Sequence, residues 1–128
     1  MWEIESIPDD AVLYYRVHKG FVVEGQLIPG AFKERGEGEN RGMSTDWNKY
    51  STAEEALARS KKPVDNGIVS FIVGDTRSIK DIVAEHAPEP DNQAHSHIKG
   101  IPQKKPMKTR IRRQLLDACT WEIKPENI

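Results

Sequence analysis

The chain has 128 residues, of which 37% are hydrophobic and 30% are charged, and its formal net charge is −1. This composition predicts one water-soluble globular domain over residues 1–128, because the length suits a single core. No apolar run approaches the roughly 20 residues of a membrane span, and residues 1–6 lack the features of a secretory signal. The single cysteine, Cys119, excludes an internal disulfide and favours a cytoplasmic location.

Residues 11–18 are the first predicted strand, because they are rich in β-branched and aromatic side chains. Alternation places Val12, Tyr14, Arg16 and His18 on one face and Leu13, Tyr15 and Val17 on the other. Residues 21–28 form a second extended segment that is broken at Gly25. The charged, glycine-rich residues 33–42 predict an exposed loop.

A short strand or turn is expected at residues 43–47, followed by a helix over about 52–60. Two overlapping capping boxes favour that helix, one pairing Ser51 with Glu54 and the other pairing Thr52 with Glu55. Pro63 closes the segment.

The second half of the chain predicts three more strands and one more helix. Residues 67–74 are the most apolar segment and predict a central strand, residues 76–80 predict a helical turn or a loop, and residues 82–86 predict another strand. Apolar residues at helical spacing predict a helix over about 106–118, and residues 120–123 predict a last short strand. The fold class is therefore α+β, with two helices against a small mixed or antiparallel sheet.

Three of the four histidines, His86, His95 and His97, lie close together in the sequence. If residues 94–98 are extended, His95 and His97 face the same way and His86 is a third candidate ligand for a transition metal. No cysteine or second His-x-His element accompanies them, so we expect solvent-facing or hydrogen-bonded loop histidines rather than a metal site. Asn92, just before His95, is a candidate to orient that imidazole in proton transfer or to form a turn.

Arg16 and His18 share a predicted strand face with aromatic neighbours, which is an arrangement suited to an anionic ligand. The alternative is a solvated polar face with Arg16 paired to an acid. Residues 44–47 add a compact polar and aromatic group, in which Trp47 either packs at the edge of the core or offers a stacking surface. The candidate ligand-binding residues are Arg16, His18, Ser44, Asp46, Trp47, His86, Asn92 and His95.

Charge is distributed unevenly along the chain. Residues 1–98 carry 11 Lys and Arg against 17 Asp and Glu, whereas residues 99–128 carry 8 against 3. This basic end either neutralises the acidic body, contacts an acidic partner, or binds nucleic acid without sequence specificity. The basic residues concerned are Lys99, Lys104, Lys105, Lys108, Arg110, Arg112 and Arg113.

The order of several short motifs resembles that of a group of small uncharacterised bacterial proteins. These motifs are a Tyr-Arg-Val strand containing Arg16, a Ser-x-Asp-Trp turn at 44–47 and an Asn-x-Ala-His motif at 92–95. The resemblance spans about residues 12–123, with Met43 where leucine is usual and Thr45 where valine is usual. It implies no established activity. It does imply that a shared site would use Arg16, Ser44, Asp46, Trp47 and His95.

Two classes of function remain open from the sequence. The first is a small cytoplasmic binding or accessory module with a polar and aromatic cleft, whose protein or small-molecule partner and cofactors are unknown. The second is a nucleotide-handling enzyme, either an ADP-ribosyltransferase-like domain or a toxin-like domain, suggested by a first strand with Arg16 followed by a serine-containing turn.

Overall fold

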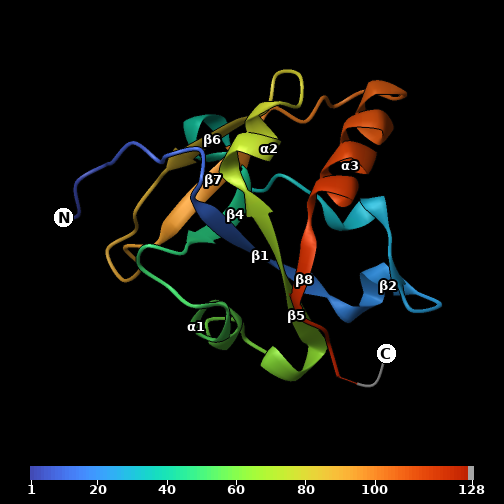
Figure 1. Cartoon of the computed structure of the whole chain (residues 1–128), viewed down its shortest axis with the longest axis horizontal. Helices are drawn as coiled ribbons and strands as arrows, with labels where there is room; N and C mark the ends of the chain where they lie inside the picture. The colour runs from blue at the N-terminus through green and yellow to red at the C-terminus, as the bar shows by residue number, and fades with distance from the viewer. Residues whose placement is uncertain (127–128) are drawn as a thin grey trace.

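The computed structural model describes residues 1–126, and within these residues a six-stranded antiparallel sheet organises the fold (Figure 1). The strand order is β6-β7-β4-β1-β5-β8, and a separate hairpin pairs β2 with β3. The strands are β1 (Val12–His18), β2 (Val22–Val23), β3 (Gln26–Leu27), β4 (Met43–Trp47), β5 (Asn66–Ile72), β6 (Val83–His86), β7 (His95–Lys99) and β8 (Thr120–Ile123). The helices are α1 (Ala53–Ala58), α2 (Val73–Arg77) and α3 (Met107–Ala118).

One face of the sheet carries the main hydrophobic core. The inward side chains of β1 and β5 pack beneath α2 and α3, which lie together on this side of the sheet (Figure 1). At its centre the ring of Phe32 lies 5.8 Å from the ring of Tyr15 and 5.9 Å from that of Phe71. Burial of such large aromatic side chains removes much apolar surface from water and stabilises this core.

The opposite face of the sheet is covered only in part, by α1 (Figure 1). Ala53 and Ala56 of this helix pack on Ile68 of β5. The helix begins with a capping box in which Thr52 accepts from the N–H of Glu55 and Glu55 accepts from the N–H of Thr52. Because α1 is short, much of the polar surface of this face stays open.

The structure confirms the predicted α+β class, and the sheet is antiparallel. The segment at residues 21–28 is a tight hairpin, with φ of 52° at Glu24 and 79° at Gly25 in its turn. A third helix, α2, replaces the end of the strand expected at 67–74 and overlaps the start of the helical turn or loop expected at 76–80. Its N-cap, Ile72, offers no capping side chain, so the usual sequence signal for a helix start is missing.

The part of the chain from residue 1 to residue 126 contains no helix that is long and apolar enough to cross a membrane. Cys119 is partly buried at the end of α3, where its thiol donates to the carbonyl of Leu116 at 3.2 Å. Burial raises the pKa of this thiol to about 11, so it is a structural cysteine and a poor nucleophile.

Candidate functional site

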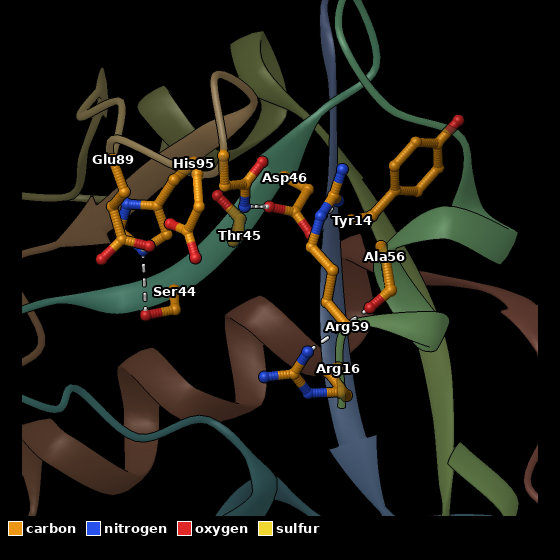
Figure 2. A pocket seen from close by; sticks show the side chains of 11 residues that line it. Tyr14, Arg16, Ser44, Thr45, Asp46, Ala56, Arg59, Glu89 and His95 are labelled. Carbon is orange, nitrogen blue, oxygen red and sulfur yellow. Dashed lines mark hydrogen bonds and ion pairs between the residues drawn. The ribbon is translucent and has the colours of Figure 1, made fainter. Parts of the chain in front are cut away.

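A polar cleft of about 370 Å³ opens on the sheet face that α1 covers only in part (Figure 2). Strands β1, β4 and β7 form its floor, α1 forms one wall, and the turn at residues 87–94 forms the other. The residues that line it are Tyr14, Arg16, Ser44, Thr45, Asp46, Ala56, Arg59, Glu89, Asp91, Asn92 and His95.

Strand register explains why residues from distant parts of the sequence meet here. Asp46 of β4 stands opposite Tyr14 of β1 on one side and opposite His95 of β7 on the other. Residues opposite one another in antiparallel strands project from the same face, so these side chains share the cleft. Arg16 and Ser44 lie two residues along their strands from Tyr14 and Asp46, and therefore point to the same face.

Asp46 anchors both walls of the cleft. Its Oδ2 atom accepts from Arg59 at 3.0 Å, and its Oδ1 atom accepts from the amide of Asn92 at 2.8 Å. Arg59 also donates to Ser51 Oγ at 2.9 Å, so two acceptors, Ser51 and Asp46, fix the position of its guanidinium. The ion pair is partly buried, which makes it worth more than an exposed surface pair.

His95 is held in one orientation beside Ser44. Its Nδ1 atom lies 2.8 Å from the carbonyl oxygen of Ala87, and its Nε2 atom lies 3.3 Å from Ser44 Oγ. Glu89 Oε1 lies 3.9 Å from the same Nε2 atom. Figure 2 shows this group at one end of the cleft, with Arg16 and Arg59 toward the other.

Arg16 has few partners for a guanidinium on the floor of a cleft. Its Nη1 atom donates to the carbonyl of Ala56 at a long 3.4 Å. No carboxylate within residues 1–126 forms an ion pair with it. Most of its five N–H donors are therefore available to a ligand.

A second, larger hollow of about 710 Å³, here called the basic groove, continues from the cleft. Arg16, Ser44 and Arg59 line both spaces. The charged side chains that line the basic groove are Arg16, Lys33, Arg35, Arg59, Lys61, Lys62 and Asp65. Asp65, the sole carboxylate among them, is paired with Lys19 at 3.0 Å, so the basic groove is strongly cationic.

The sequence candidates divide between these spaces and the core. Arg16, Ser44, Asp46, Asn92 and His95 line the cleft. His18 lines the basic groove, where its Nδ1 atom accepts from the N–H of Gly20 at 2.9 Å.

Trp47 and His86 lie on the core side of the sheet, away from the cleft. Trp47 is buried, and its ring meets that of His86 edge-on at 5.3 Å. His86 accepts from the N–H of Glu5 at 3.0 Å and contacts the carbonyl oxygen of Gln93 at 2.7 Å. These contacts give His86 a structural role, fastening the first residues of the chain to β6.

The three clustered histidines do not converge. His95 and His97 lie on one face of β7, with ring centroids 4.8 Å apart, whereas His86 faces the core. Among residues 1–126, no group of three or more His, Cys, Asp or Glu side chains has an arrangement that could hold a metal ion. His97 is buried, and desolvation together with the neighbouring charges of His95 and Lys99 lowers its pKa to about 4.

Some of the basic side chains of residues 99–113 make contacts within the protein. Lys99 pairs with Glu85 at 2.6 Å, and Arg112 donates to the carbonyl of Phe32 at 2.9 Å. Lys108 and Arg112 line a small hollow beside Lys33, where Glu34 is also present. The exposed cations that remain are Lys104, Lys105, Arg110 and Arg113.

No protein-family model, curated protein or solved structure matches this chain. Function therefore has to be inferred from the chemistry of the cleft and the basic groove. Sequence reasoning missed Arg59, Glu89 and the lysines of the basic groove. The one available signal for Arg59 was its place at the end of the predicted 52–60 helix.

Proposed function

We propose that this protein binds a phosphorylated small molecule that also carries hydroxyl groups, such as a nucleotide. The observation that carries the proposal is the position of Arg16, where the cleft joins the basic groove, with most of its donors unoccupied. A guanidinium presents a planar fork of N–H groups that matches two oxygens of a phosphate.

The charge of the site changes from one end to the other, and this favours a ligand with two chemically different ends. Lys33, Arg35, Lys61 and Lys62 extend the positive region beyond Arg16. At the other end of the cleft, the turn at 87–94 carries exposed carboxylates that accept hydrogen bonds from hydroxyl groups. A phosphate therefore fits the Arg16 end, and the hydroxyls of a sugar fit the turn.

The resemblance to small bacterial proteins supports the same location, and we propose that it reflects a shared site. Of its five implied residues, Arg16, Ser44, Asp46 and His95 line the cleft, and Trp47 packs behind it. A cytoplasmic location, expected from the single cysteine, is part of this proposal.

Calorimetric titration tests the proposal with AMP, ATP and NAD, and with adenosine as the uncharged match. We expect the phosphorylated ligands to bind, adenosine to bind at least about tenfold more weakly, and added salt to weaken the binding. Arg16→Ala should abolish the difference between AMP and adenosine. Lys80→Ala removes an exposed cation outside the cleft and the basic groove and should bind like the wild type.

Two results would overturn the proposal. One is equal affinity for AMP and adenosine in the wild-type protein, because the phosphate would then contribute nothing. The other is unchanged AMP affinity in a folded Arg16→Ala variant, because the phosphate would then bind elsewhere.

A further inference from the structure

We infer that Ser44 and His95 form a nucleophile and base pair that cleaves an acyl group from a phosphorylated leaving group. Ser44 lines both the cleft and the basic groove, and its Oγ atom lies 3.3 Å from Nε2 of His95, which lines the cleft. The choice of leaving group rests on the proposed function. The identity of the nucleophile does not.

The hydrogen bonds of His95 determine where its proton lies. The carbonyl of Ala87, 2.8 Å from Nδ1, can only accept, so Nδ1 carries a hydrogen. In the neutral ring Nε2 is then unprotonated and accepts from the hydroxyl of Ser44. A nucleophile facing a base that a third group orients is the arrangement used in serine-dependent acyl transfer.

The two members of the pair differ in exposure in the way this chemistry requires. Ser44 is exposed to the cleft, so a substrate can reach its hydroxyl. His95 is buried, with 9% of its surface exposed, and keeps a fixed orientation. Glu89, with Oε1 3.9 Å from Nε2, stabilises the imidazolium that forms when His95 takes the proton. A half-exposed carboxylate at this distance does so without blocking Ser44.

The reaction runs in two balanced steps. Ser44 Oγ attacks the acyl carbon, its proton passes to His95 Nε2, and the bond from that carbon to the phosphate oxygen breaks. The phosphate departs with the bonding electron pair and takes the proton from His95 Nε2, while Arg16 stabilises its charge. Water then gives a proton to His95 Nε2 and attacks the acyl-serine, and the bond to Ser44 Oγ breaks as that oxygen takes the proton back from His95. The products are a carboxylate and the original hydroxyl, with the second proton of the water released to solvent.

A fluorophosphonate probe tests the nucleophile without any assumption about the leaving group. We expect one covalent adduct on Ser44, located by peptide mass spectrometry, that forms about 100-fold more slowly in His95→Gln. Ser70→Ala is the matched control, because Ser70 lies on the same face of the sheet and donates to Glu122 rather than facing a histidine. It should be labelled like the wild type.

Labelling of Ser44 in the wild-type protein is a readout that does not require a variant to fold. A folded wild-type protein whose Ser44 is not labelled would overturn the inference. Equal labelling rates in a folded His95→Gln variant and in the wild type would overturn it as well.

Hydrolysis of acetyl phosphate tests the leaving group. We expect turnover that is lost in Ser44→Ala, and a kcat/KM at least about tenfold lower in Arg16→Ala. If AMP binds and Ser44 is not labelled, the inference is wrong and the proposed function stands. If Ser44 is labelled but the protein neither binds AMP nor hydrolyses acetyl phosphate, Ser44 is confirmed as the nucleophile. The assignment of a phosphorylated leaving group is then wrong, and so is the proposed function.

Discussion

The side-chain amide of Asn92 donates to Oδ1 of Asp46 at 2.8 Å, joining two residues 46 positions apart in the sequence. The same side chain accepts from the N–H of Ala94 at 3.1 Å, so Asn92 both closes its own turn and ties that turn to β4. Since Asp46 also binds Arg59, one carboxylate fixes both walls of the cleft.

Asn92→Asp isolates this contact, because it keeps the acceptor for Ala94 and replaces the donor to Asp46 with a second carboxylate. We expect unfolding free energy to fall by on the order of 2 kcal/mol at pH 7, since two carboxylates then face each other in a half-buried site. Urea denaturation measures the loss. The double variant Asp46→Asn with Asn92→Asp removes the repulsion and should be more stable than Asn92→Asp alone. If it is not, repulsion between these two positions is not the cause.

Local patterns predicted much of the sheet. The alternation of β1 placed Arg16 on the polar face, and the capping box of Thr52 located α1. The start of α2 was missed because Ile72 and Val73 continue the apolar pattern of β5, and no polar side chain caps the helix. At these two residues the sequence pattern of a strand and that of a helix start are the same, so only tertiary packing decides between them.

The candidate site was predicted less completely, because it depends on pairing between distant strands. Alternation along β4 puts Ser44 and Asp46 on one face and Trp47 on the other, so the core position of Trp47 was accessible from the sequence. The position of His86 was not, since it depends on the register between β6 and β7. The basic groove likewise combines segments that only the fold brings together.

Tyr15 links the core to the segment that carries the cations of the basic groove. Its hydroxyl donates to the carbonyl of Ala31 at 2.6 Å and accepts from the N–H of Lys33 at 3.3 Å. We expect Tyr15→Phe to lower the unfolding free energy by about 1–3 kcal/mol, because two buried backbone groups lose a partner. Thermal and urea unfolding would measure this. Tyr14→Phe is the control, since the Tyr14 hydroxyl makes no hydrogen bond to residues 1–126, and it should stay within about 0.5 kcal/mol of the wild type.

The capping box at Thr52 stabilises α1, and the C-cap residue of this helix, Arg59, lines the cleft. Thr52→Ala removes the acceptor for the N–H of Glu55 and should cost about 1 kcal/mol in urea denaturation. Glu54→Ala changes an exposed side chain in the same turn that takes no part in the capping box, and a smaller effect is expected. Equal losses in the two variants would mean that helix propensity or charge, rather than the cap, controls the stability of α1.

His97 lies against the backbone of Gly42 at the edge of the cleft face. A Cβ atom placed on Gly42 would come within 3.0 Å of the His97 ring, so β4 and β7 pack closely here. Within the described part of the chain, Nδ1 of His97 is buried and has no hydrogen-bond partner. The titratable groups around it are His95, Lys99 and Glu85, and Glu85 is the one that favours the charged ring.

Because the folded protein lowers the pKa of His97 to about 4 from an ordinary value near 6.5, the unfolded chain binds more protons between these pH values. This contribution to stability is therefore complete above about pH 6.5 and is lost as the pH falls toward 4. Between pH 7.5 and pH 5, the unfolding free energy should fall in both proteins, and the fall should be smaller in His97→Gln by on the order of 1–2 kcal/mol. Urea midpoints at both pH values give this difference. Parallel losses in His97→Gln and the wild type would assign the acid sensitivity to other groups.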